Sequence, residues 1–213
     1  VPSGKTWGGT FEYSGSAAQN IVGGTYNNLT MSGSGGATAA ANITVEGVLS
    51  LASANPSSTK GILDMATYTL LMGSSATTTG QGDVTGIIQR TSIAANTTYT
   101  FGNQLTTVNF PNVGTLPSQM SLKVTIGSAP TWRTGAVQRY YDLIQTGGSG
   151  TQAVLYNHYL ESELNGNDES LLVFWVRDIS ASSTTEYGRS AHSASENWVM
   201  ISNVNIGVFS SSF

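Results

Sequence analysis

Short apolar segments that recur at a nearly fixed step are the feature that most constrains the fold of this chain. Ile43 and Ile62 lie 19 residues apart, and Leu29 and Leu49 lie 20 residues apart. Clusters of glycine, serine and asparagine separate the segments. A solenoid has this pattern, because each coil buries its apolar side chains against the neighbouring coils. The spacing therefore predicts a stack of β-coils that ends near residue 90.

The same spacing predicts which residues face each other. We expect Ile43 to stack over Ile62 and Leu49 to stack over Tyr68. The expected inner stack consists of Leu29, Ile43, Leu49, Ile62, Tyr68 and Ile87, and the expected strands are 26–31, 42–46, 48–52, 60–64, 67–72 and 82–90. Asn27 and Asn28 either form side-chain ladders or hold turns, and we favour turns.

A second block begins near Thr91, with longer strands at irregular spacing. Leu122, Val124 and Ile126 alternate with polar residues, which places them on one face of a strand. The expected strands of this block are 106–110, 120–126, 153–158, 171–176 and 198–208. This pattern predicts an antiparallel β-sandwich, and its core accounts for Trp132, Trp175 and Trp198 without a ligand.

We therefore expect an all-β protein of two domains. Residues 1–92 would form a short β-solenoid with an extended lead-in over 1–13, and residues 93–213 would form the sandwich. No helix is strongly indicated, and the stretch 157–163 fits a helical turn as well as a strand followed by a loop.

Composition narrows the class of function. Only 9% of the 213 residues are charged, so uncharged polar side chains must provide solubility, as in strand-rich secreted proteins. The net charge is −4 and the eight basic residues are scattered, which argues against nucleic-acid binding. No apolar run reaches the roughly 20 residues of a membrane helix. Cysteine is absent, and the chain starts at Val1 without an initiator Met, as expected of a mature form or a unit of a longer protein.

Three segments resemble repeat units of large cell-surface proteins of Bacteroidota-type bacteria. They are Phe11–Ile21, Gly24–Gly33 with the run Tyr-Asn-Asn-Leu-Thr-Met-Ser-Gly, and Ala41–Leu51 with the run Asn-Ile-Thr-Val-Glu-Gly-Val-Leu-Ser-Leu. The later segments Tyr99–Asn103 and Gln138–Tyr141, and that around Trp175, resemble the sandwich that follows such coils. The resemblance implies export, often by the type IX route, and roles in adhesion, gliding or surface filaments.

Few residues suggest chemistry. The chain has two histidines, His158 and His192, and no Gly-x-Ser-x-Gly elbow with triad partners, so we expect no catalytic residue and no cofactor. Carboxylates cluster at Glu161, Glu163, Asp168 and Glu169. Calcium prefers several such oxygen ligands, but no calcium-loop spacing is matched, and we expect a solvated loop and no metal.

Two further patterns have both a functional and a plain explanation. Glu46, Asp64 and Asp83 fall one per coil, which suits either a paired-carboxylate glycosidase or a soluble surface. The aromatic candidates for sugar stacking are Trp7, Tyr13, Tyr26 and Trp132, for which we favour packing. Asn28, Asn42 and Asn96 begin Asn-x-Ser/Thr sequons, which we attribute to chance.

We therefore expect a structural extracellular protein, the subunit or repeat of a surface fibre or adhesin. Its contacts with other copies would be made head to tail by 1–13 and 198–213, since an unpaired strand edge invites a partner. The first alternative is an adhesin module that binds surface glycans through exposed Trp or Tyr. The second alternative is a polysaccharide-degrading enzyme with convergent carboxylates in a groove.

Overall fold

The computed structural model describes residues 3–51, 61–179 and 182–213, and confirms the all-β class with 54% strand and 3% helix. The chain forms two compact units, described here one at a time. Unit 1 consists of Val1–Ser92 and Thr100–Gln104, and unit 2 of Ile93–Tyr99 and Leu105–Phe213. Within the described ranges, no helix has the length and hydropathy needed to cross a membrane.

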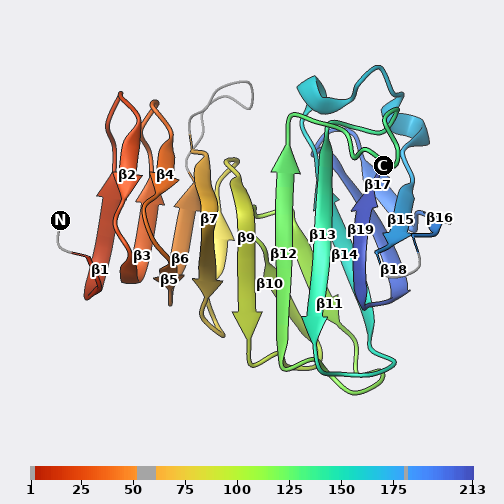
Figure 1. Cartoon of the computed structure of the whole chain (residues 1–213), viewed down its shortest axis with the longest axis horizontal. Coiled ribbons are helices and arrows are strands. Elements are labelled where there is room, and N and C mark those ends of the chain that lie inside the picture. The colour runs from red at the N-terminus through yellow and green to blue at the C-terminus, as the bar shows by residue number, and fades with distance from the viewer. Residues whose placement is uncertain (1–2, 52–60, 180–181) are drawn as a thin grey trace. The chain divides into compact units, whose positions relative to one another are not determined.

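Unit 1 is a parallel β-solenoid of about four turns (Figure 1). Within it, strands of one coil pair in parallel with strands of the next. β-Branched and aromatic residues favour the extended strands, while glycine and serine allow the corners. The strands are β1 (Lys5–Tyr13), β2 (Gln19–Ile21), β3 (Gly24–Met31), β4 (Ala37–Ala39), β5 (Ile43–Val45), β6 (Val48–Leu51), β7 (Leu63–Met72), β8 (Thr77–Thr79) and β9 (Val84–Thr91). The solenoid predicted from the sequence is confirmed.

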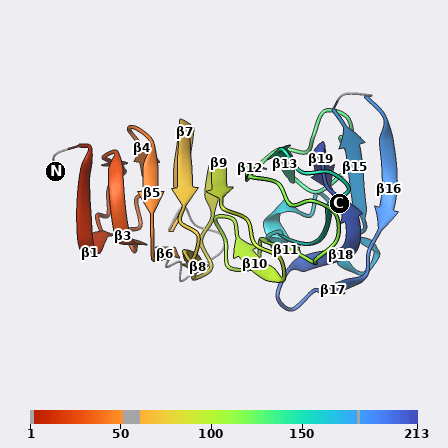
Figure 2. The same ribbon diagram turned by 90° about the horizontal axis from the view of Figure 1, so that it is seen from below.

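Side chains of successive coils align in columns across the strands that Figure 2 shows in succession. The predicted alignment of Leu29 with Leu49 is confirmed, and both side chains are fully buried. Another column consists of Trp7, Tyr26, Val45, Met72 and Arg90, of which the last four are fully buried. Burial of apolar side chains in these columns is the main favourable contribution to the stability of unit 1.

Two of the predicted stacks are wrong. Ile43 lies beside Leu70 and not beside Ile62. Leu49 lies beside Thr78 and not beside Tyr68. The step from the second coil to the third is thus 27 to 29 residues, whereas the first step is 19 to 20.

Insertions at two places lengthen that step. Twelve residues separate the end of β6 from the start of β7 (51 to 63), whereas six separate β3 from β4 (31 to 37). The register of β7 against β9 also shifts between Asp64 and Thr69, which pair with Thr85 and Ile87, so that β7 spans five residues where β9 spans two. Residues 52 and 60, the ends of two expected strands, lie outside the described residues.

The shift also changes which side chains face inward. Leu29, Ile43 and Leu49 are buried as predicted, whereas Ile62 and Ile87 are only half-buried and Tyr68 is 36% exposed. Their neighbours Leu63 and Ile88 are buried instead. Side chains alternate between the two faces of a strand, so an error of one residue exchanges the buried and outer sets.

Asn27 and Asn28 lie inside β3, so their interpretation as turn residues is wrong. Asn28 Oδ1 accepts a hydrogen bond from the backbone N–H of Val48, at 2.9 Å. Asn42 Oδ1 accepts one from the N–H of Thr69, also at 2.9 Å. Two of the three sequon asparagines therefore use their side chains to join one coil to the next.

Unit 2 contains two antiparallel sheets that pack face to face, as expected of the sandwich. One sheet has the order β12–β13–β19–β15–β16 and the other β10–β11–β14–β18–β17. The elements are β10 (Thr97–Thr100), β11 (Thr107–Phe110), β12 (Gln119–Ile126), β13 (Arg139–Thr146), β14 (Gln152–His158), the 3₁₀ turns η1 (Glu161–Glu163) and η2 (Glu169–Leu171), β15 (Phe174–Asp178), β16 (Thr184–Gly188), β17 (Ala191–Ser193), β18 (Trp198–Asn205) and β19 (Val208–Ser212). The Tyr141 hydroxyl on β13 donates to the carbonyl of His158 on β14, which joins the two layers.

Two expectations for unit 2 are corrected. The tail 198–208 is not one strand, because β18 ends at Asn205 and β19 starts at Val208 in the other sheet. Trp132, Trp175 and Trp198 are only half-buried, so they do not form the centre of the sandwich. Fully buried side chains fill it instead, among them Phe110, Tyr141, Tyr159 and Phe174.

Candidate functional site

The first candidate site is the N-terminal end of unit 1, which begins with β1. We expected residues 1–13 to be a lead-in, but Lys5–Tyr13 forms the first strand of the solenoid and pairs with β3. Its register shifts between Trp7 and Thr10, where Gly8 and Gly9 add one residue relative to β3. Residues 1 and 2 lie outside the described part of the chain.

Aromatic side chains occupy this end of the solenoid. The Trp7 ring stacks on the Tyr26 ring, with centroids 4.5 Å apart and planes 25° apart. The Phe11 ring lies 5.6 Å from Trp7, 5.8 Å from Tyr26 and 5.3 Å from Tyr13. Offset and edge-to-face aromatic contacts at such distances are favourable beyond their buried area. The four rings form what we call the aromatic end: Trp7, Phe11, Tyr13 and Tyr26.

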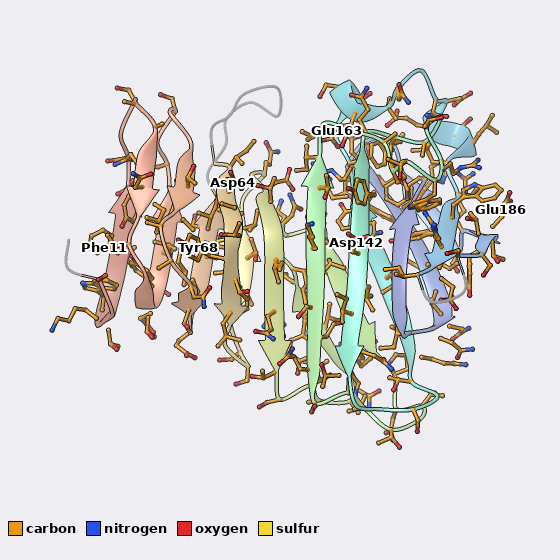
Figure 3. The ribbon with its side chains drawn as sticks, in the orientation of Figure 1. Phe11, Asp64, Tyr68, Asp142, Glu163 and Glu186 are labelled. Carbon is orange, nitrogen blue, oxygen red and sulfur yellow. The ribbon has the colours of Figure 1, made fainter. Side chains whose placement is uncertain are left out.

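The aromatic end is only partly covered. Tyr26 and Tyr13 are buried, whereas Trp7 and Phe11 are half-buried (Figure 3 labels Phe11). The Tyr26 hydroxyl donates to the carbonyl of Val22 at 2.7 Å, and burial raises the pKa of that hydroxyl. Sequence analysis named Tyr13 and Tyr26 as exposed sugar platforms, which is wrong, and missed the half-exposed Phe11.

The backbone of β1 has one free edge. Among the described residues, β1 pairs only with β3 and β2 pairs only with β4. Only two charged residues, Lys5 and Glu12, lie on β1, and Glu12 accepts a hydrogen bond from Ser32 Oγ. Natural proteins usually protect edge strands with charges, bulges or a cover. Here the protection amounts to these two charges and the irregularity at Gly8 and Gly9.

The opposite end of unit 1 is closed by the returning segment Thr100–Gln104. The buried Arg90 guanidinium donates to the carbonyls of Gly73 at 2.8 Å, Ala76 at 2.7 Å and Thr100 at 2.8 and 3.0 Å. It also lies 5.7 Å from the centroid of the buried Phe101 ring. Arg90 is the last member of the column that Trp7 begins, so the column ends in a hydrogen-bonded cation.

Further hydrogen bonds secure this closure. The Asn103 side chain donates to the Gly82 carbonyl at 2.9 Å and to Asp83 Oδ1 at 3.1 Å. The backbone N–H of Val84 donates to the Gly102 carbonyl at 2.9 Å. The two ends of unit 1 therefore differ: one is covered by the chain itself, and the other presents half-exposed rings and a free strand edge.

The acidic segment 161–169 is held by internal bonds. Glu163 is buried and forms an ion pair with the buried Arg139, with contacts of 2.7 and 3.0 Å. Glu169 Oε1 accepts from the Tyr159 hydroxyl at 2.8 Å, and burial is the main cause that raises the pKa of Tyr159. Asp168 caps η2 by accepting from Ser170, and these bonds lower its pKa. The expected solvated loop is thus wrong for Glu163.

The other predicted polar sites do not come together. Asp64 pairs with Thr85, whereas Asp83 is a buried partner of Asn103, so Glu46, Asp64 and Asp83 form no column of acids. His158 is buried with Nδ1 2.8 Å from the Asn197 carbonyl, and His192 lies half-buried on β17. In the described ranges no group of three or more His, Asp or Glu has the geometry to hold a metal ion.

A small pocket in unit 2 was not predicted. Its lining includes Arg133, Asn167, Asp168, Leu171 and Trp175, and its volume is about 140 Å³. The Arg133 guanidinium lies over the Trp175 ring, 3.5 Å from its centroid. These residues come from three separate segments, so no local pattern indicates the pocket. Trp132, the predicted sugar platform of this region, is not among the lining residues.

Comparison with protein-family models, with curated proteins and with solved structures finds no match to this chain.

Proposed function

We propose that this chain is a non-catalytic structural module of an extracellular fibre or adhesin, and that the aromatic end of its solenoid receives a strand from another copy. The observation that carries the proposal is the difference between the two ends of unit 1. The C-terminal end is closed by Arg90 and the segment 100–104, whereas β1 keeps a free edge.

An added strand would gain from both the backbone and the side chains of β1. Its N–H and C=O groups would pair with the free edge, and its apolar side chains would cover Trp7 and Phe11. A contact between two different surfaces that does not close on itself produces a filament. The low content of charged residues, 9%, adds little electrostatic repulsion against such stacking and suits an extracellular surface protein.

The other contact segment, 198–213, needs revision. β18 lies between β14 and β17, and β19 lies between β13 and β15, so neither strand has a free backbone edge to offer. β16 (Thr184–Gly188) pairs only with β15 among the described strands, and its side chains are mostly exposed. We therefore assign the donor strand of the next copy to β16.

A matched pair of substitutions tests the proposal. Phe11→Lys places a charge where the incoming strand would cover it, while Tyr68→Lys makes the same change at an exposed position on β7 (Figure 3). Burying an unpaired ammonium costs several kcal/mol, so Phe11→Lys should raise the concentration needed for assembly by about a hundredfold or more. Tyr68→Lys should assemble as the unmodified chain does.

Light scattering against concentration and electron microscopy of the purified chain measure this effect, and circular dichroism checks that both variants fold. The proposal fails if the unmodified chain stays monomeric at high concentration. It also fails if folded Phe11→Lys assembles at the same concentration as Tyr68→Lys.

A further inference from the structure

We propose that the pocket of unit 2 binds one carboxylate-bearing sugar residue, of the hexuronate class. This inference is independent of assembly through β1, because every residue that lines the pocket belongs to unit 2. The argument rests on the size of the pocket, one immobilised arginine, two oriented acceptors and an apolar wall.

The arginine is held in place without using its hydrogen-bond donors. The Arg133 guanidinium lies over Trp175, 3.5 Å from the ring centroid, and donates no hydrogen bond to any residue in the described ranges. Its backbone is fixed, since its N–H donates to the Pro130 carbonyl and its carbonyl accepts from Ala136, at 2.9 and 3.0 Å. A planar guanidinium with free donors matches the two oxygens of a carboxylate.

Two acceptors on the same wall suit hydroxyl groups. Asn167 Nδ2 donates to the carbonyls of Gly135 at 2.9 Å and Leu164 at 2.7 Å. Both amide hydrogens are therefore engaged, which leaves Oδ1 as the group that Asn167 offers to a ligand. Asp168 Oδ1 accepts both bonds from Ser170, so its second oxygen has no partner within the described part of the chain.

The remaining lining and the size select a ring. Leu171 is 72% exposed at the pocket, and Leu172 and Trp175 add further apolar surface. A volume of about 140 Å³ admits one six-membered sugar ring with its C–H face on this wall. Hydroxyl donors for Asp168 and Asn167, a carboxylate for Arg133 and an apolar ring face together describe a uronate, and a simple carboxylate lacks two of these three features.

Isothermal titration calorimetry of the full chain tests the inference with glucuronate, a uronate oligosaccharide, glucose, acetate and a dipeptide. Glucuronate should bind, and glucose, acetate and the dipeptide should each bind at least about tenfold more weakly. An oligosaccharide that binds more tightly than glucuronate identifies a polysaccharide chain as the source, and equal affinity identifies the single sugar or a chain end.

Two arginine substitutions provide the control. Arg133→Lys keeps the charge but loses the fork, so uronate affinity should fall about tenfold. Arg177→Lys changes a half-exposed arginine on β15 that does not line the pocket, and affinity should not change. No detectable uronate binding, equal binding of glucose or the dipeptide, or an equal loss in both variants would overturn the inference.

Discussion

The closure at the C-terminal end of unit 1 makes a quantitative prediction for Arg90→Met. Methionine keeps much of the volume of the side chain but removes all donors. The carbonyls of Gly73, Ala76 and Thr100 then lose their bonds from the guanidinium. An unsatisfied buried acceptor costs about 1–3 kcal/mol.

The full sum over three carbonyls overstates the cost. Gly73 and Thr100 are half-buried, so water reaches their carbonyls in part, whereas Ala76 is buried. We therefore expect Arg90→Met to lower the free energy of unfolding of unit 1 by about 3–5 kcal/mol, the range observed when one partner of a buried charged contact is removed. With a denaturant slope of about 2 kcal/mol per M, the urea midpoint falls by roughly 2 M.

Hydrogen exchange locates this effect. The backbone amides of Thr78, Gly80 and Val84 donate to residues of the segment 100–104. If Arg90 holds that segment in place, these amides should exchange about a hundredfold faster in Arg90→Met under conditions where unit 1 stays folded.

The control is Arg177→Met, which makes the same change at a half-exposed position and should shift stability by less than about 0.5 kcal/mol. Equal midpoints for the two variants, or unchanged exchange at the three amides, would refute the assignment of Arg90 as the closure of the solenoid.

Two further changes test the packing of each unit. Gly35→Ala should destabilise unit 1 by about 1–3 kcal/mol in urea unfolding, because the added Cβ would lie 2.1 Å from the Ala17 carbonyl carbon; Gly9→Ala, with open space at Cβ, is the control, and equal midpoints would contradict the packing. Glu163→Gln should destabilise unit 2 by about 3–5 kcal/mol, since it leaves the buried Arg139 charge without its carboxylate; a loss below about 1 kcal/mol in the same assay would show that the pair is not desolvated.

The sequence predicted the class of fold because its strongest signals are local. Alternating and recurring apolar residues such as Leu29, Leu49, Leu122 and Val124 indicate strands and faces without knowledge of the rest of the chain, and all four are buried. The register between coils was predicted only where the step was constant. Where insertions follow Leu51 and Asp64, the pattern of spacing no longer reports which residues face each other.

Charged core residues were the part that the sequence concealed. Glu163 has the composition of a loop acid around it, and its partner Arg139 is 24 residues away. Arg90 follows an apolar strand, and its acceptors are carbonyls, which every residue possesses. The pocket residues Arg133 and Trp175 are likewise 42 positions apart. Such sites depend on tertiary contacts, so composition and periodicity carry no signal for them.

The difference between the ends of unit 1 also gives any assembly a direction. A strand added at β1 would continue the parallel ladder and the column that begins with Trp7 and ends with Arg90. The same strand finds no equivalent position at the other end, because Arg90 and Asn103 already satisfy the carbonyls there from within the chain. Growth by backbone pairing on unit 1 is therefore restricted to the β1 edge. This restriction makes Phe11→Lys sufficient to block it, since no second solenoid edge compensates for the loss.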